Sequence, residues 1–267
     1  MSKTVYPLEK LLSRDEALIA RMIPLIENTI VPYHRATVTG MQNVPTGPVL
    51  YVGNHNGALY SADTWIFAAS ILRARGIDAA PHALAHDLAL AAPGLGRVLR
   101  RFGAVPAHPE NSLRLFGAGR SVMVYPGGDQ EAMRPFRARN EVRFGGRQGY
   151  IRTALRAGVP IVPVAAQGAH STLIVLADFP EVARALGIDK RFRTKVFPLS
   201  FVLPWGFVLG PTPPYIPFPA KIRVEVLPAI YFDRGPDAAD DPDCVSECAL
   251  RVEGALQEAV TRLAMSA

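Results

Sequence analysis

The chain has 267 residues, of which 49% are hydrophobic and 19% are charged. This balance excludes an intrinsically disordered chain, which needs low hydrophobicity and high net charge, and a coiled coil, in which charged heptads dominate. The net charge of +6 favours anionic partners, among them nucleic acid, phosphate-bearing ligands and acidic lipid. Two cysteines, Cys244 and Cys248, form neither a CxxC motif nor a disulfide framework.

The N-terminal region predicts an amphipathic helix. Ser13 and Glu16 have the spacing of a capping box, and apolar residues then recur at helical spacing as far as Ile30. Pro24 lies inside this run and is expected to kink or restart the helix. The apolar stripe suits packing on the domain or lying on a membrane. We therefore expect a helical segment over 1–32 and a single domain over 33–267. The sequence has no signal peptide and no apolar run long enough to span a bilayer.

Strand and helix patterns alternate through the rest of the chain. The expected strands lie at 35–40, 49–52, 104–107, 121–125, 159–165 and 222–227. The expected helices lie at 64–75, 93–103, 109–117 and 148–157, with a last one after Asp241-Pro242. This alternation predicts an α/β fold with a mostly parallel sheet flanked by helices. Two prolines in 159–165 predict an edge-like or irregular strand, and the proline-rich segment 197–220 predicts neither a regular helix nor a central strand.

Three of the short strands end in polar or glycine-rich loops, at 53–57, 125–131 and 165–170. Ligands bind at the carboxyl ends of strands in open α/β sheets, so these loops are the expected site. His55 directly follows a buried strand, and Asp63 lies eight residues further on. A carboxylate there would hold the imidazole in one tautomer for general-base work. The alternative is that Asp63 only caps its helix and His55 only ends its strand.

Other chemistries find little support in the sequence. There is no GxSxG elbow and no phosphate-binding loop in a strand-to-helix setting, and the two cysteines belong to a C-terminal helix. His82 and His86 are four apart but have apolar neighbours, so we expect no metal site. Basic residues follow the second loop, which suits the phosphates of a nucleotide-bearing donor or of lipid headgroups, or else a solvated loop. They are Arg134, Arg137, Arg139, Arg143 and Arg147.

Three sequence blocks resemble a known family. VLYVGNHNG, FGAVPAHPENSLRLFGAGRSVMVYPGG and GVPIVPVAAQG stand in the order seen in the glycerolipid (lysophospholipid) acyltransferase family. The similarity covers residues 33–235, and the PGG followed by a Glu is closest to the diacylglycerol acyltransferase-like branch, which includes plastid phytyl-ester synthases.

The resemblance implies an O-acyltransferase of lipid metabolism that takes part in phospholipid biosynthesis. It implies acyl-CoA or acyl carrier protein as the donor, a lipid-like hydroxyl acceptor and no cofactor, with His55 as general base and Asp63 as its partner. It also implies a peripheral or monotopic place on the cytoplasmic face of a membrane, and no nucleic-acid partner. The residues expected to bind acceptor or donor are Asn54, Gly127, Gly128, Glu131, Arg134, Arg137 and Arg139. The alternatives are a thioesterase or lipid hydrolase, and a non-catalytic membrane lipid-binding protein.

The sequence departs from the family pattern in ways that bear on the acceptor. Seven residues separate His55 from Asp63 where the family has four, so the pair forms only if 57–62 loops out. Ala107 and His108 stand where phospholipid-type members carry Arg, and Gly127 stands where they carry Glu. These changes favour a neutral or unusual alcohol as acceptor. The apolar segment 197–220 either dips into the membrane interface and admits acyl chains or is part of the core.

Overall fold

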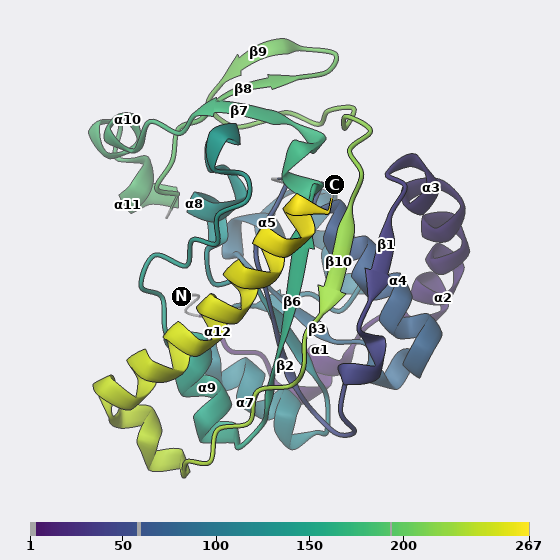
Figure 1. Ribbon diagram of the computed structural model, residues 1–267, viewed down its shortest axis with the longest axis vertical. Coiled ribbons are helices and arrows are strands. Elements are labelled where there is room, and N and C mark those ends of the chain that lie inside the picture. Colours follow the sequence, from purple (N-terminus) through teal and green to yellow (C-terminus); the bar gives the residue numbers. More distant parts are fainter. Residues whose placement is uncertain (1–3, 58–59, 193, 267) are drawn as a thin grey trace.

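A seven-stranded sheet forms the centre of the protein in the computed structural model, which describes residues 4–57, 60–192 and 194–266 (Figure 1). Every pair of neighbouring strands is parallel except β10 with β6. The strands in sheet order are β1 (Thr37–Thr39), β10 (Arg223–Val226), β6 (Ile161–Gln167), β2 (Leu50–Gly53), β5 (Val122–Val124), β3 (His82–Ala85) and β4 (Val105–Pro106). The expected α/β fold with a mostly parallel sheet is confirmed.

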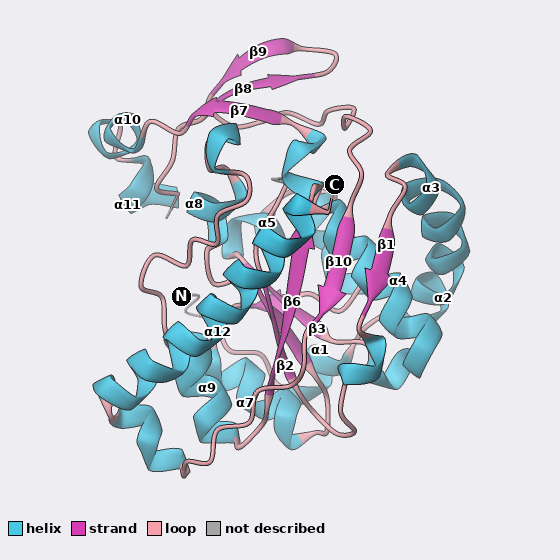
Figure 2. Cartoon of the chain, viewed as in Figure 1, coloured by secondary structure: helices cyan, strands magenta, loops and turns pink. Residues whose placement is uncertain are grey.

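Helices connect the strands and cover the sheet (Figure 2). The longer ones are α2 (Glu16–Leu25), α4 (Ala62–Arg75), α7 (Pro109–Gly117), α9 (Gly149–Ala157) and α12 (Pro242–Met265). The shorter ones are α1 (Leu8–Leu12), α3 (Val31–Tyr33), α5 (Asp87–Ala91), α6 (Leu95–Arg101), α8 (Gly128–Ala132), α10 (Pro180–Ala185) and α11 (Ile188–Phe192). No helix of the described residues is long and apolar enough to cross a bilayer.

Alternate residues of the strands face two separate cores. Leu50 and Val52 of β2 pack in the core under α12, α9 and α7, whereas Tyr51 packs in the core under α4. A strand buried on both faces shows a continuous apolar run, which is why 49–52 is recognisable in the sequence. The sheet is therefore a rigid frame whose carboxyl edge holds the loops that follow β2, β5 and β6.

The N-terminal helices pack on the domain. Ile19 and Ile26 are buried, and the segment around Ile26 contacts α4. The N-cap of α2 is Asp15, whose carboxylate accepts from the Leu18 N–H, and not Ser13 as the capping-box pattern predicts. The chain does not break at Pro24: a π-helical segment, Ile26–Ile30, begins two residues later and continues into α3. Such a segment absorbs an irregularity without ending the helix.

The expectation of an edge-like strand at 159–165 is wrong, because β6 is central and lies between β10 and β2. Pro163, within β6, is tolerated because of its place along the strand. The Pro163 carbonyl accepts from the Leu227 N–H, one residue beyond the end of β10. The N–H that Pro163 lacks is thus missing only where the β10–β6 ladder has ended.

A second, three-stranded sheet lies beyond the carboxyl end of β6 (Figure 1). It consists of β7 (Ile174–Ala177), β8 (Leu199–Val202) and β9 (Gly206–Leu209), all antiparallel, with β8 in the middle. The expectation that 197–220 holds no central strand is therefore wrong. Its prolines stand outside β8 and β9, at 198, 204 and from 211 onward, so they do not interrupt the ladder.

Candidate functional site

The three loops predicted as the site come together at the carboxyl edge of β6, β2 and β5. Asn54, after β2, exchanges two hydrogen bonds with the Ala166 main chain of β6, at 2.9 and 2.8 Å. His170, in the third loop, bonds through Nε2 to the carbonyl of Arg134 at 2.8 Å. Asn54 is thereby committed to the frame of the site, which argues against the substrate-binding role expected for it.

Both main-chain polar groups of His55 are held by the loop after β5. The His55 N–H donates to Glu131 Oε2 at 2.8 Å, and the His55 carbonyl accepts from Arg134 Nη1 at 2.7 Å. The other Glu131 oxygen accepts from the Arg143 N–H at 3.0 Å. Glu131 and Arg134 therefore position His55, and neither carboxylate oxygen of Glu131 lacks a protein donor.

Arg134 is 0% exposed and uses all of its donors inside the protein. Its five N–H groups bond to the carbonyls of His55, Glu131, Ala138 and Arg139 and to Oδ1 of Asn56. A guanidinium has five N–H donors, so none remains for a phosphate. The substrate-binding role expected for Arg134 is not supported, and its role is to fix the His55 loop.

Asn56 links this network to Asp63. Its amide nitrogen donates to Asp63 Oδ2 at 3.0 Å, while its amide oxygen accepts from Arg134 Nη2 at 2.7 Å. Asp63 Oδ1 is buried and has no hydrogen-bond partner among the described residues, and the same is true of His55 Nδ1. Among the described residues, these two atoms therefore do not bond to each other, and the expected pair of His55 with Asp63 is not formed through them. Asp63 reaches the His55 loop only through Asn56 and Arg134. Two residues of the insert between them, 58 and 59, lie outside the described residues.

Burial shifts the titration of all three acid–base groups. Burial, with the nearby Arg134 charge, lowers the pKa of His55 to about 4, so the imidazole is neutral at pH 7. Burial raises the pKa of Asp63 to about 6 and that of Glu131 to about 7. Opposite shifts within one cluster of titratable groups are typical of functional sites.

The Tyr125 ring lies beside the His55 ring. Tyr125 directly follows β5, and the centroids of the two rings are 5.0 Å apart. The Tyr125 hydroxyl forms a 2.6 Å hydrogen bond with Thr64. A Cβ at Gly53 would come within 2.6 Å of the Tyr125 ring, so only glycine lets the ring approach β2 this closely. His55 as a whole residue is partly exposed beside the Tyr125 ring, although its Nδ1 is buried.

Of the remaining predicted residues, the two glycines shape the loop after β5, and the two arginines lie closer to the surface. A Cβ at Gly127 would meet Glu131 Oε2 at 2.2 Å, so this glycine permits the Glu131 contact. Gly128 has a φ of +53° and begins α8. Arg139 stacks on Phe136, whereas Arg137 is exposed. Substrate binding by Arg137 and Arg139 stays a prediction.

Sequence reasoning missed His170 as part of the site. It is buried, its Nδ1 has no partner within the described part of the chain, and burial lowers its pKa to about 3. Its place in the third loop was the available signal. A neutral imidazole whose Nε2 donates to the Arg134 carbonyl completes the frame of that arginine.

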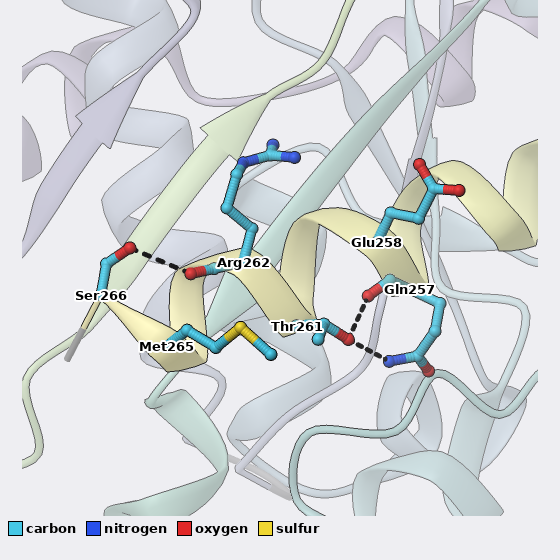
Figure 3. Close-up of a pocket in the computed structure, with 6 residues that line it drawn as sticks. All are labelled: Gln257, Glu258, Thr261, Arg262, Met265 and Ser266. Atoms are coloured by element: carbon cyan, nitrogen blue, oxygen red, sulfur yellow. Dashed lines mark hydrogen bonds between the residues drawn. The ribbon is translucent and has the colours of Figure 1, made fainter.

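The hollows elsewhere on the protein offer less chemistry. Figure 3 shows one whose lining comes from the last turns of α12 and from Ser266 just after it, with Gln257 and Thr261 bonded to each other at 3.1 Å. Its volume is about 450 Å³. A second, of about 400 Å³, lies between Tyr231 and Arg251. Neither is on the three loops. Over the described ranges, no group of three or more metal-ligating side chains comes together.

Comparison with known families places the chain. The model of the diacylglycerol acyltransferase family matches residues 102–235, and the model of the acyltransferase family matches residues 35–167. The chain belongs to the diacylglycerol acyltransferase family. Together the two matches contain β2, β5 and β6 and all three loops of the site, so the enzyme class is that of acyl transfer.

Individual relatives extend this result. An uncharacterized protein of Mycobacterium tuberculosis is 28% identical over 242 residues, which is 90% of this chain and 64% of the relative. A DGAT1/2-independent enzyme synthesizing storage lipids from Bos taurus is 28% identical over 75% of this chain and 54% of its own length. The chain thus spans between half and two thirds of these relatives.

A solved structure shares the fold. The 1-acyl-sn-glycerophosphate acyltransferase PlsC from Thermotoga maritima matches with a TM-score of 0.53 and 16% identity, over 96% of this chain and 85% of that one. This likeness supports the architecture, in which a mostly parallel sheet presents its loops at one edge.

Proposed function

We propose that this acyltransferase moves a fatty acyl group from acyl-CoA or an acyl carrier protein to a hydroxyl of a lipid-like acceptor, with His55 as general base. The observation that carries the proposal is the buried frame around His55. Glu131 and Arg134 hold both of its main-chain polar groups, while its ring Nδ1 has no hydrogen-bond partner among the described residues. A frame of this kind holds a reacting group in place before the substrate arrives.

The steps follow from the protonation states. The imidazole is neutral at pH 7 and accepts the proton of the acceptor hydroxyl as its oxygen attacks the thioester carbonyl. Asp63 is mostly ionised at that pH, and its negative charge, linked to the His55 loop through Asn56 and Arg134, stabilises the imidazolium. The tetrahedral oxyanion collapses to the ester, and the departing thiolate takes the proton back from His55. The thioester and the alcohol are thus converted to the ester and the free thiol with no acyl-enzyme intermediate.

A neutral alcohol is the favoured acceptor. Residue 107, just after β4, is alanine, and the ring of His108 is spent in capping α7, where it accepts from the Glu110 N–H at 3.1 Å. The buried Arg134 has no donor left for a phosphate. The storage-lipid enzyme of Bos taurus among the relatives is consistent with an acceptor such as diacylglycerol.

The test is whether acyl transfer needs an acceptor. Purified protein is given oleoyl-CoA with no acceptor, with diacylglycerol, with a long-chain alcohol and with lysophosphatidic acid, and free thiol and lipid products are measured. The proposal predicts thiol release and ester formation with the neutral alcohols. Equal thiol release without any acceptor would instead indicate a thioesterase. No release in any mixture would indicate a non-catalytic lipid-binding protein.

A further inference from the structure

The small sheet β7–β8–β9 exposes one apolar face. Phe207 and Leu209 alternate along β9 and are 72% and 61% exposed, and Trp205, in the β8–β9 turn, is 59% exposed. The chain from 196 to 220 contains no Asp, Glu, Lys or Arg. The exposed apolar residues of this surface, called here the hairpin face, are Leu176, Leu203, Trp205, Phe207, Leu209 and Ile216.

The opposite face of the same sheet is well packed. Val202 and Val175 are buried there with Ala132 and Met133, at the end of α8 in the site loop. The sheet is therefore an ordered part of the fold, and its exposed face is not a consequence of loose packing. Soluble proteins rarely expose apolar clusters of this kind unless something covers them in use.

From these observations we infer that the hairpin face docks the enzyme onto a lipid bilayer. Aromatic residues such as Trp205 favour the membrane interface, and an uncharged segment enters it without desolvating a charge. Lys190 and Lys195 are exposed in the segment that joins β7 to β8, and the chain carries +6 overall, which complements anionic headgroups. The inference rests on the proposed function only in taking the acceptor to come from that bilayer.

The hairpin face is connected to the His55 loop. Tyr215, which follows β9, donates from its hydroxyl to the Gly57 carbonyl at 2.9 Å. The Phe218 N–H donates to the Thr172 carbonyl at 2.9 Å, two residues after the third loop. Figure 1 shows the small sheet beyond the edge where β6 ends. Docking by this face sets the catalytic loops close to the lipid surface, so an apolar acceptor reaches His55 without crossing water.

Sedimentation with vesicles tests the inference. The probes are vesicles of phosphatidylcholine, with and without phosphatidylglycerol. The variant is the double substitution Phe207→Ser with Leu209→Ser, and the matched control is Leu250→Ser, an equally exposed leucine on α12. We expect tighter binding to the anionic vesicles, a drop in partitioning of at least about tenfold in the double variant, and no change in the control. Equal binding by wild type and the double variant would overturn the inference.

Tryptophan fluorescence provides a second readout. The sequence has two tryptophans, so in a Trp65→Phe background Trp205 reports alone. Its emission is expected to shift to the blue with vesicles and to be quenched by lipids brominated on the acyl chain. An unchanged Trp205 signal, or a wild-type dimer that binds no vesicles and becomes monomeric in the double variant, would overturn the inference. Because binding is measured without turnover, and is repeated on His55→Ala, its outcome is separate from that of the proposed reaction.

Discussion

β2 and β8 are both short apolar strands, but their surroundings differ. All residues of β2 are buried, since helices cover both faces of the main sheet, whereas β8 is buried on one face only. β2 leads directly into the His55 loop, which is held by buried polar groups. The comparison separates two uses of apolar sequence: β2 fixes the position of the His55 loop, whereas β8 is the middle strand of a sheet with one uncovered face, which we propose docks on lipid.

The largest effect is expected where the buried frame is broken. Arg134→Met removes five hydrogen bonds and leaves the carboxylate of Glu131 without its nearby cation, so we expect a loss of about 3–5 kcal/mol in the free energy of unfolding. Arg137→Met, at an exposed arginine of the same loop, is expected to change it by less than about 0.5 kcal/mol. Urea unfolding measures both, and similar values for the two variants would contradict the assigned frame.

Asp63→Asn separates activity from stability. Transfer is expected to fall about 100-fold, because the imidazolium loses its partner. Stability changes in the other direction. The pKa of Asp63 is raised on folding from 3.8 to about 6, so its ionised form costs the folded state about 3 kcal/mol above pH 6 and nothing below about pH 4. The variant should therefore unfold at a higher urea concentration than wild type at pH 8 and at the same concentration near pH 4. A variant with wild-type activity would remove Asp63 from the mechanism.

The pH profile distinguishes the carboxylates from the imidazole. With a pKa lowered to about 4, His55 stays neutral in weak acid and produces no loss of activity near pH 6.5. Glu131, with a pKa raised to about 7, gains a proton below that pH and loses acceptor capacity for the His55 N–H. We expect kcat/KM of wild type to fall with a midpoint near pH 7. Glu131→Gln, whose amide has one acceptor oxygen for two N–H groups, should be less active at every pH, with its remaining fall near pH 6, where Asp63 titrates. One midpoint shared by both proteins would contradict this assignment.

The smallest effect is expected on the hairpin face. Leu209→Ala removes an exposed side chain and should change the free energy of unfolding by less than about 0.5 kcal/mol. Val52→Ala, in β2, removes a fully buried one and should cost about 1–2 kcal/mol. If thermal unfolding gave the two the same cost, Leu209 would be part of the core and the contrast between the strands would disappear.

Local patterns predicted the elements that depend on local sequence. The apolar run at 49–52 and the helix at 109–117, with proline at its first position, match β2 and α7. The position of β6 was missed, because the tolerance for Pro163 depends on where β10 ends, at Val226, 63 residues further along the chain (226 − 163). The hairpin was missed because apolar residues stand on both faces of β8 and β9, which removes the alternation that marks a half-buried strand.

The site was predicted as a set of loops but not as a network. His55 and the loop edges follow from sequence order, since parallel strands bring their carboxyl ends together. The role of Arg134 could not be predicted in this way, because four of its five acceptors are main-chain carbonyls that the folded loops bring around it. The sequence does not distinguish a buried arginine that positions a loop from an exposed arginine that binds a phosphate.

The most direct test of the central claim compares two histidines whose pKa values are lowered to the same extent. His55 and His82 both have a pKa lowered to about 4, but His82 lies at the start of β3 and bonds through Nδ1 to the Gly103 carbonyl. In His82→Asn, the side-chain amide nitrogen replaces Nδ1 as the donor to the Gly103 carbonyl. Thiol release from oleoyl-CoA with diacylglycerol should fall by about 10²–10⁴ in His55→Ala and remain close to wild type in His82→Asn. A His55→Ala enzyme that keeps more than about a tenth of wild-type activity would contradict the account.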